Sequence, residues 1–246
     1  YTVDFDALER RAADPAVKLM LLCNPHNPAG RVWTADELTK LNDICMKHGV
    51  KVISDEIHCE LIMKGHTYIP FASLSDESLH NSITLNSPTK AFNIAGLQIA
   101  NVVACDEDVR HKIDRAININ EICDVNPFGV LALQAAYNEG AEWLDSLNEY
   151  LYDNYMELRR FFSERMPNIG VTHLEGTYLV WADIRSTGMT SDALTEKLLK
   201  EGHVMVNSGT MYGKTAGEGF LRINIACPRS RMIEGLERMA RVIGKL

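Results

Sequence analysis

The chain has 246 residues, with 25 lysines and arginines against 33 aspartates and glutamates, a net charge of −8 and 46% hydrophobic residues. These values are typical of a globular protein and exclude disordered, collagen-like and disulfide-stapled classes. At roughly 150 residues per domain, the length allows one large or two modest domains. The acidic balance disfavours nucleic acid as a partner, and no apolar run approaches the about 18 residues that a membrane span needs.

The cysteines are scattered along the chain without any Cys-x-x-Cys pair, which fits neither a zinc site nor a small disulfide framework. We therefore expect free thiols in a reducing, cytoplasmic compartment, packed as small buried hydrophobes. The six positions are Cys23, Cys45, Cys59, Cys105, Cys123 and Cys227.

Strand-like and helix-like segments alternate through the first half of the chain. The short apolar run Val17–Cys23 predicts a buried strand. Thr34 and Glu37 form a capping-box pattern, which predicts that a helix begins here, and Gly49 stands where a left-handed cap ends such a helix. Further strands are expected at Val50–Ser54, Ile83–Asn86 and Ile99–Cys105.

This order of segments predicts a largely parallel α/β sheet with right-handed crossovers and helices on both faces. Sheets of this kind bind ligands at the carboxyl ends of their strands. Asn24, Asp55 and Lys90 each follow a predicted strand, so this edge is where we expect a functional site.

The second half of the chain has a different pattern. Asn126 and Pro127 open a predicted helix that ends near Gly140, and a long helical stretch runs from Ala141 to Met166. We place a boundary near Tyr150, between a domain of residues 1–150 and a smaller α+β domain of residues 151–246. The second domain is expected to hold strands at Val171–Leu174, Tyr178–Asp183 and Phe220–Ala226 and helices at Ser191–Lys200 and Ser230–Ile243.

Three other motifs are set aside. The run Gly209–Thr215 has three residues between its glycines where a phosphate-binding loop requires four, and Gly217–Gly219 leads into a predicted strand where a dinucleotide fingerprint opens a helix. Both are predicted to be turns. The run Asp55–Glu60 has no second cluster with ligand spacing to complete a metal site, so we expect no metal.

Three segments in this order resemble the pyridoxal-phosphate (PLP) enzymes of the aminotransferase class I/II family. They are Asn24-Pro-His-Asn27-Pro-Ala-Gly30, Ser54-Asp55-Glu56-Ile57-His58 and Ser87-Pro-Thr-Lys90-Ala-Phe-Asn-Ile-Ala-Gly96, and the later Gly219-Phe-Leu-Arg222-Ile-Asn-Ile-Ala fits the same family. The resemblance implies the PLP-dependent transferase-like fold of aspartate aminotransferase (fold type I). Residues 1–150 would then be the C-terminal part of the large PLP-binding domain, and residues 151–246 the small domain.

The resemblance implies roles that suit the residue types. Lys90 matches the lysine whose amine forms a Schiff base with PLP and later acts as the base at the substrate Cα. Asp55 matches the carboxylate that keeps the PLP ring nitrogen protonated. Arg222 matches the arginine whose planar fork holds the substrate α-carboxylate.

The remaining cofactor contacts are also carried over from the family. Asn27 corresponds to the donor to the PLP ring oxygen, and His58 stands where many relatives have a tyrosine for the same oxygen. Ser87 matches a serine that binds the cofactor phosphate. Gln98 stands where many relatives have a phosphate-binding arginine, which leaves a hydrogen-bond donor but removes one charge.

The resemblance implies an amino-acid substrate and a homodimer, and leaves the reaction open. The motifs look more like the C–S lyase (cystathionine β-lyase) branch, which predicts β-elimination from L-cystathionine or related cysteine conjugates, with an aminotransferase as the alternative. Compared with the family, the chain begins just before the strand that precedes Asn24. A second alternative is therefore a noncatalytic fragment with an incomplete sheet and an exposed edge.

Overall fold

The computed structural model describes residues 1–122 and 124–245. The chain packs into two compact units: unit 1 holds residues 1–26, 32–62 and 66–146, and unit 2 holds residues 27–31, 63–65 and those from Leu147 onward. The expected boundary near Tyr150 lies close to the point where helix α6 (Ala141–Arg165) passes from one unit to the other. Whether the units match the proposed domains 1–150 and 151–246 stays a prediction.

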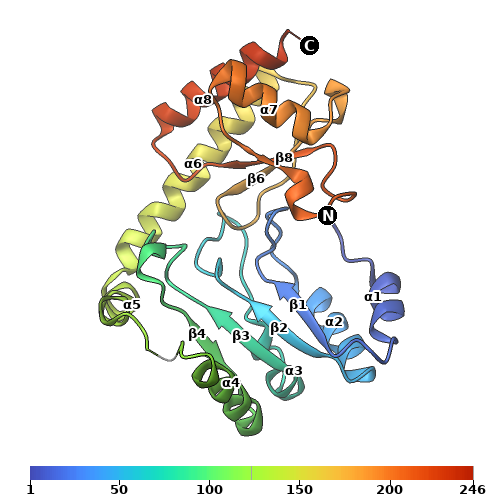
Figure 1. The fold of residues 1–246 in the computed structure, drawn as a ribbon. Coiled ribbons are helices and arrows are strands. Elements are labelled where there is room, and N and C mark those ends of the chain that lie inside the picture. Colours follow the sequence, from blue (N-terminus) through green and yellow to red (C-terminus); the bar gives the residue numbers. More distant parts are fainter. Residues whose placement is uncertain (123, 246) are drawn as a thin grey trace. The chain divides into compact units, whose positions relative to one another are not determined.

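Unit 1 is built on a four-stranded sheet in the order β1-β2-β3-β4 (Figure 1). The first three strands are parallel, as the alternating segments predict, whereas β4 runs antiparallel to β3. The sheet is therefore mostly parallel, with an antiparallel edge strand. The strands are β1 (Leu19–Cys23), β2 (Lys51–Asp55), β3 (Ser82–Asn86) and β4 (Asn101–Val103).

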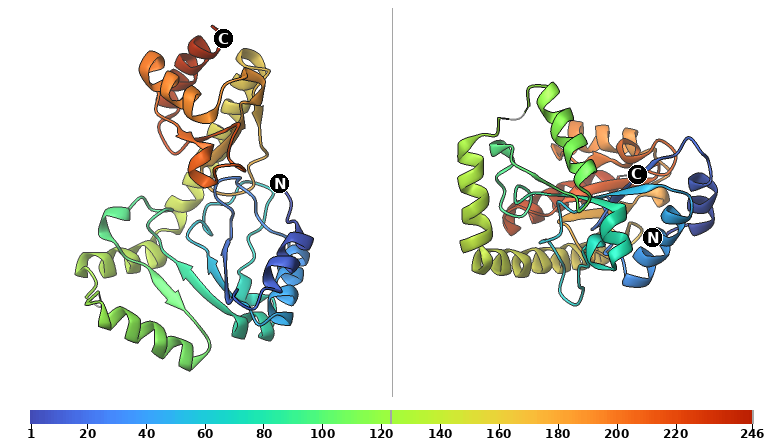
Figure 2. Two further views of the ribbon diagram at one scale, coloured as in Figure 1. Left: turned by 45° about the vertical axis from the view of Figure 1, so that its right-hand side comes forward. Right: turned by 90° about the horizontal axis from the view of Figure 1, so that it is seen from below.

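Helix α2 confirms the predicted capping signals. The Thr34 hydroxyl accepts from the Glu37 amide at 3.2 Å, and the Glu37 carboxylate accepts from the Thr34 amide at 2.9 Å. Gly49 has a φ of +68°, in the left-handed region. Figures 1 and 2 show α1 and α2 beside the β1 end of the sheet. The helices of unit 1, with two short 3₁₀ turns, are α1 (Phe5–Ala12), α2 (Ala35–Lys47), η1 (Phe71–Ser73), α3 (Asp76–Asn81), η2 (Ala95–Leu97), α4 (Glu107–Ile119) and α5 (Pro127–Glu139).

The two faces of this sheet differ in burial. Leu22 and Val52 pack into a core with residues of α1, α2 and η1, whereas Leu19 and Leu21 of β1 are 58% and 66% exposed. The prediction of a sheet covered on both faces is therefore wrong at β1, where the helices of the described ranges 1–122 and 124–245 bury one face. The prediction of an incomplete sheet stays a prediction.

Unit 2 has an antiparallel sheet in the order β5-β6-β8-β7, with α7 and α8 packed against each other (Figures 1 and 2). Gly213 and Gly219 have positive φ, which confirms that the two glycine runs form turns. Its elements besides α6 are β5 (Gly170–Val171), β6 (Leu179–Asp183), η3 (Arg185–Thr187), α7 (Ser191–Gly202), β7 (Asn207–Ser208), η4 (Gly209–Tyr212), β8 (Phe220–Asn224) and α8 (Arg229–Ile243).

The predicted free thiols are confirmed at the described positions Cys23, Cys45, Cys59, Cys105 and Cys227, and Cys123 lies outside the described residues. Of these five, Cys45 alone is buried, so the expectation of burial is wrong for the others. Desolvation raises the pKa of the Cys45 thiol to about 11. Within the described part of the chain, each helix is too short or too polar to cross a membrane.

Candidate active site

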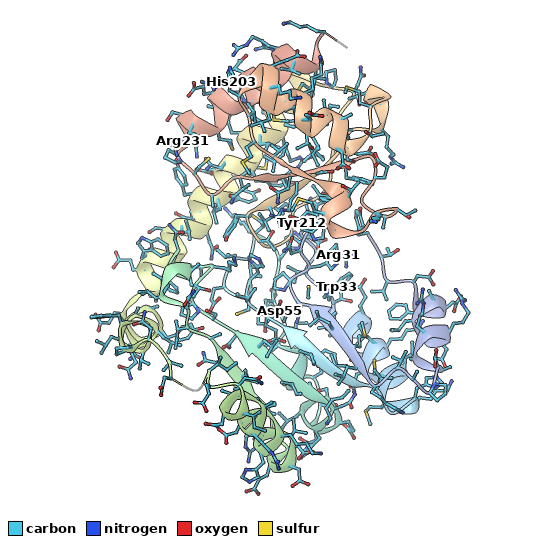
Figure 3. The ribbon with its side chains drawn as sticks, in the orientation of Figure 1. Arg31, Trp33, Asp55, His203, Tyr212 and Arg231 are labelled. Carbon is cyan, nitrogen blue, oxygen red and sulfur yellow. The ribbon has the colours of Figure 1, made fainter. Side chains whose placement is uncertain are left out.

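The carboxyl ends of β1, β2 and β3 lie side by side in unit 1. Asp55, the last residue of β2, pairs with Cys23 on one side and with Leu85 on the other. The backbone amide of Asn24 donates to the Asp55 carbonyl at 2.9 Å, which continues the pairing past the end of β1. This register places the Asp55 carboxylate at the sheet edge where parallel strands bind ligands (Figure 3).

Glu56, the residue after Asp55, stabilises this strand end through hydrogen bonds. Glu56 is buried, and its carboxylate accepts from Ser54 Oγ at 2.8 Å, from the Phe71 amide at 2.9 Å and from the Tyr68 hydroxyl. Burial, and then the nearby Glu56 charge, raise the pKa of Tyr68, so its hydroxyl stays protonated and donates to Glu56. This role of Glu56 was not predicted from the sequence, where its place beside Asp55 in an acidic run was the available signal.

Lys90 is half-buried in the turn that follows β3. The residues after it are anchored by aromatic packing, because Phe92 stacks on Trp143 with ring centroids 5.3 Å apart. Gly140 makes room for this contact, since a Cβ there would come within 2.4 Å of the Phe92 ring. The segment that carries the lysine is therefore held from its C-terminal side.

The other predicted contacts of unit 1 are placed as follows. Ser87 is 1% exposed, and its hydroxyl donates to the Ile99 carbonyl at 2.5 Å. That bond braces the turn before Lys90, and the role of Ser87 toward a phosphate stays a prediction. His58 is buried, and Gln98 is exposed with a left-handed φ of +52°, so their roles toward PLP also stay predictions.

Unit 2 brings Asn27 and Arg222 into contact, although 195 residues separate them in sequence. Nη1 of Arg222 donates to Oδ1 of Asn27 at 3.0 Å. The short loop of Asn27 is tied to unit 2 by an ion pair of 2.9 Å between Arg31 Nε and Glu175 Oε2, and by the Glu175 amide, which donates to the Gly30 carbonyl at 2.8 Å. Gly30 has φ +72°, and a Cβ there would meet Leu174 at 2.4 Å, so the loop requires glycine.

The predicted site residues thus form two groups. Asn27 and Arg222 touch each other in unit 2, and the second group lies in unit 1. The members of that second group are Asp55, His58, Ser87, Lys90 and Gln98.

The donor chemistry fits PLP. A guanidinium has donors and no acceptor, so its contact with Asn27 uses the amide oxygen and leaves the amide NH₂ as the part of that side chain that donates elsewhere. The Asn27 amide NH₂ is therefore a suitable hydrogen-bond donor to the PLP ring oxygen. The Asp55 carboxylate at a strand end suits a protonated ring nitrogen, and the half-buried Lys90 offers an amine.

Comparison with known proteins decides the family. The family model for aminotransferase class I and II matches residues 1–239. The chain belongs to this family. Cystathionine beta-lyase PatB of Bacillus subtilis is 41% identical over 239 residues, which is 97% of this chain and 62% of that protein.

Solved structures agree on the fold. Cystalysin from Treponema denticola, whose crystal structure contains a pyridoxal 5'-phosphate cofactor, has a TM-score of 0.97 at 35% identity and covers 100% of this chain and 62% of that one. A PLP-bound C–S lyase from Staphylococcus hominis has a TM-score of 0.90 at 34% identity, over 99% of this chain and 63% of that one. The predicted fold of the PLP-dependent aminotransferases is confirmed, and the chain spans less than two thirds of these relatives.

Proposed function

We propose that this chain provides the general base and residues that bind the cofactor and the substrate in a PLP-dependent C–S lyase. The reaction is the β-elimination of L-cystathionine, or a related cysteine conjugate, with water to a thiol, pyruvate and ammonia. One observation carries the proposal: Asp55 and the turn of Lys90 follow two paired strands at the ligand-binding edge, in a chain 41% identical to a cystathionine beta-lyase. The enzyme is proposed to act as a cytoplasmic homodimer.

Each residue has a defined task in this proposal. PLP, when bound, serves as the electron sink for the charge that develops at the substrate Cα. Lys90 Nζ removes the Cα proton, because a positioned amine is a suitable general base. The Asp55 carboxylate holds a proton on the ring nitrogen by charge, and the Asn27 amide donates to the ring oxygen. The Arg222 guanidinium binds the α-carboxylate through paired N–H donors.

His58, Ser87 and Gln98 are proposed as additional holders of the cofactor. Ser87 and Gln98 would face its phosphate, and His58 its ring oxygen. Replacing an arginine with a neutral glutamine at position 98 removes one charge from the phosphate site, so we expect weaker cofactor affinity than in relatives with arginine there.

The test is pyruvate formation from L-cystathionine by the purified protein supplied with PLP. We expect pyruvate without any added 2-oxo acid, and at least about a hundredfold loss of rate in Lys90→Ala, the usual scale for a missing general base. Lys112→Ala, which changes an exposed lysine of α4 in the same unit, is the matched control and should keep the rate.

Two results would overturn this function. Strict dependence of turnover on a 2-oxo acid acceptor would make the protein an aminotransferase. Absence of both the visible absorbance of protein-bound PLP and pyruvate at saturating cofactor would make the chain a noncatalytic fragment.

A further inference from the structure

Arg222 has a second neighbour besides Asn27. Its guanidinium carbon lies 4.6 Å from the centre of the Tyr212 ring, within the range of a cation–π contact. The Tyr212 hydroxyl accepts from Asn207 Nδ2 at 2.9 Å, and Asn207 pairs with Arg222 across β7 and β8. The tyrosine is thus held at its hydroxyl by the residue opposite Arg222, while its ring faces the guanidinium.

The backbone that carries Tyr212 is also fixed. Asp192 Oδ1 accepts from Ser208 Oγ at 2.5 Å and from Thr210 Oγ1 at 2.6 Å, which clamps both neighbours of Gly209 to the start of α7. Gly209 itself packs against another turn so closely that a Cβ would lie 2.1 Å from the Gly217 carbonyl. These contacts set the position of the 3₁₀ turn η4, and Tyr212 is its last residue.

The Tyr212 ring packs inside unit 2 as well. Trp181 meets it edge to face, with ring centroids 5.9 Å apart and an interplanar angle of 80°. A ring held at its hydroxyl, its backbone and its edge has little freedom, so it presents a fixed face to Arg222.

This packing limits the orientations open to the Arg222 guanidinium. One terminal nitrogen is committed to Asn27, and the ring covers one side of the guanidinium. A guanidinium has five N–H donors in a fixed fork, so the remaining donors stay available for a planar carboxylate. An arginine without the ring would sample more rotamers and lose entropy when it binds the carboxylate.

We propose that Tyr212 is a positioning residue that sets the affinity of Arg222 for the substrate α-carboxylate. The assignment rests on the proposed function, because it takes Arg222 as the carboxylate-binding residue. Tyr212 lies at the centre of the run Gly209–Thr215, which does not match a phosphate-binding loop, and the contacts above give it this role instead.

The test measures binding by calorimetry to the purified protein supplied with PLP. L-Alanine is the probe, because it carries the α-carboxylate and amine but no leaving group, and ethylamine is the comparison that lacks the carboxylate. We expect Tyr212→Leu to weaken L-alanine binding about tenfold, on the scale of a cation–π contact, without changing ethylamine binding. Tyr212→Phe keeps the ring and should stay within about threefold of the original affinity.

Tyr150→Leu is the matched control, because Tyr150 also lies under an arginine of the same unit, with the Arg229 carbon 5.4 Å from its ring centre. It should leave L-alanine binding unchanged. In turnover of L-cystathionine, Tyr212→Leu should raise KM and keep kcat within about twofold, as expected when uniform binding is lost.

Equal L-alanine affinity in Tyr212→Leu and the unchanged protein would overturn the assignment. So would an equal loss for ethylamine, or an equal loss in Tyr150→Leu, since either would indicate general structural damage. If the unchanged protein binds no L-alanine, the proposed function itself fails, and the positioning role fails with it.

Discussion

The two sheets of this protein are buried in different ways. In unit 2, β6 has residues of both faces in the core, from Leu179 to Ala182. In unit 1, β1 buries Leu22 on one face and exposes Leu19 and Leu21 on the other. Parallel strands are ordinarily covered on both faces, yet β1 of unit 1 exposes apolar side chains, whereas β6 of unit 2 buries its own. The proposed cofactor residues follow the strands of the more open sheet, whereas Arg222 lies in β8 of the other sheet.

The largest effect that we expect from this difference in burial is in the core of unit 2. Trp181 is 2% exposed and stacks on Phe220, with ring centroids 5.2 Å apart. We expect Trp181→Ala to lower the free energy of unfolding by about 3–5 kcal/mol, the cost of a large cavity in a closed core. Urea unfolding followed by far-UV circular dichroism measures the change. A loss below about 1 kcal/mol would show that unit 2 is not closely packed around this ring.

Adjacent residues of β1 provide the next test, because Leu22 and Leu21 point to opposite faces of one strand. We expect Leu22→Ala, on the buried face, to cost about 2–5 kcal/mol of unfolding free energy. Leu21→Ala removes the same atoms from the exposed face and should change it by about 0.5 kcal/mol or less. Equal costs would mean that something covers the second face in solution, and the contrast between the two sheets would then disappear.

Sequence patterns predicted the elements with strong local signals. The capping box at Thr34, the strand before Asn24 and the long helix from Ala141 were all found near their predicted bounds. Helix α4 was missed, although Val109, Ile113 and Ile117 stand at helical spacing and are half-buried. A second signal was the cap at Asp106, whose side chain accepts from the Val109 amide at 3.2 Å.

The site was less predictable than the elements. The motif could nominate Asn27 and Arg222, but their 3.0 Å contact depends on a loop that Arg31 and Glu175 attach to unit 2. The role of Tyr212 depends on the pairing of β7 with β8, which no local pattern encodes. Contacts between residues far apart in sequence follow from tertiary packing, and a single sequence carries little information about them.

We expect a smaller effect on the free energy of unfolding at the helix N-caps of the two units. Thr34 caps α2 in unit 1 and makes the reciprocal bonds with Glu37, whereas Thr190 caps α7 in unit 2 with a longer bond of 3.3 Å to the Ala193 amide. We expect Thr34→Ala to cost about 1 kcal/mol and Thr190→Ala about half as much. Urea midpoints of the two variants measure the difference. The matched variants Thr34→Ser and Thr190→Ser keep a hydroxyl at the cap and should retain most of the stability that the alanine variants lose. A larger cost for Thr190→Ala would contradict the ranking.

The smallest expected effects concern pH, and they have opposite signs in the two units. Burial raises the pKa of Glu60 in unit 1, so its contribution to stability is present below its ordinary value of 4.5 and is lost as the pH rises above it. The hydrogen bond from Arg185 lowers the pKa of Asp183 in unit 2, so its contribution is present above its ordinary value of 3.8 and is lost as the pH falls below it.

Substitution of each carboxylate separates these two contributions. Glu60→Gln should reduce the loss of stability between pH 4.5 and 7 and leave the acid side unchanged. Asp183→Asn should reduce the loss below pH 3.8, by about 1 kcal/mol or less, because Arg185 is largely exposed and solvent screens the pair. Urea midpoints across this pH range measure both. If Glu60→Gln instead makes stability fall more steeply between pH 4.5 and 7, then hydrogen bonds to the charged carboxylate outweigh the effect of its burial.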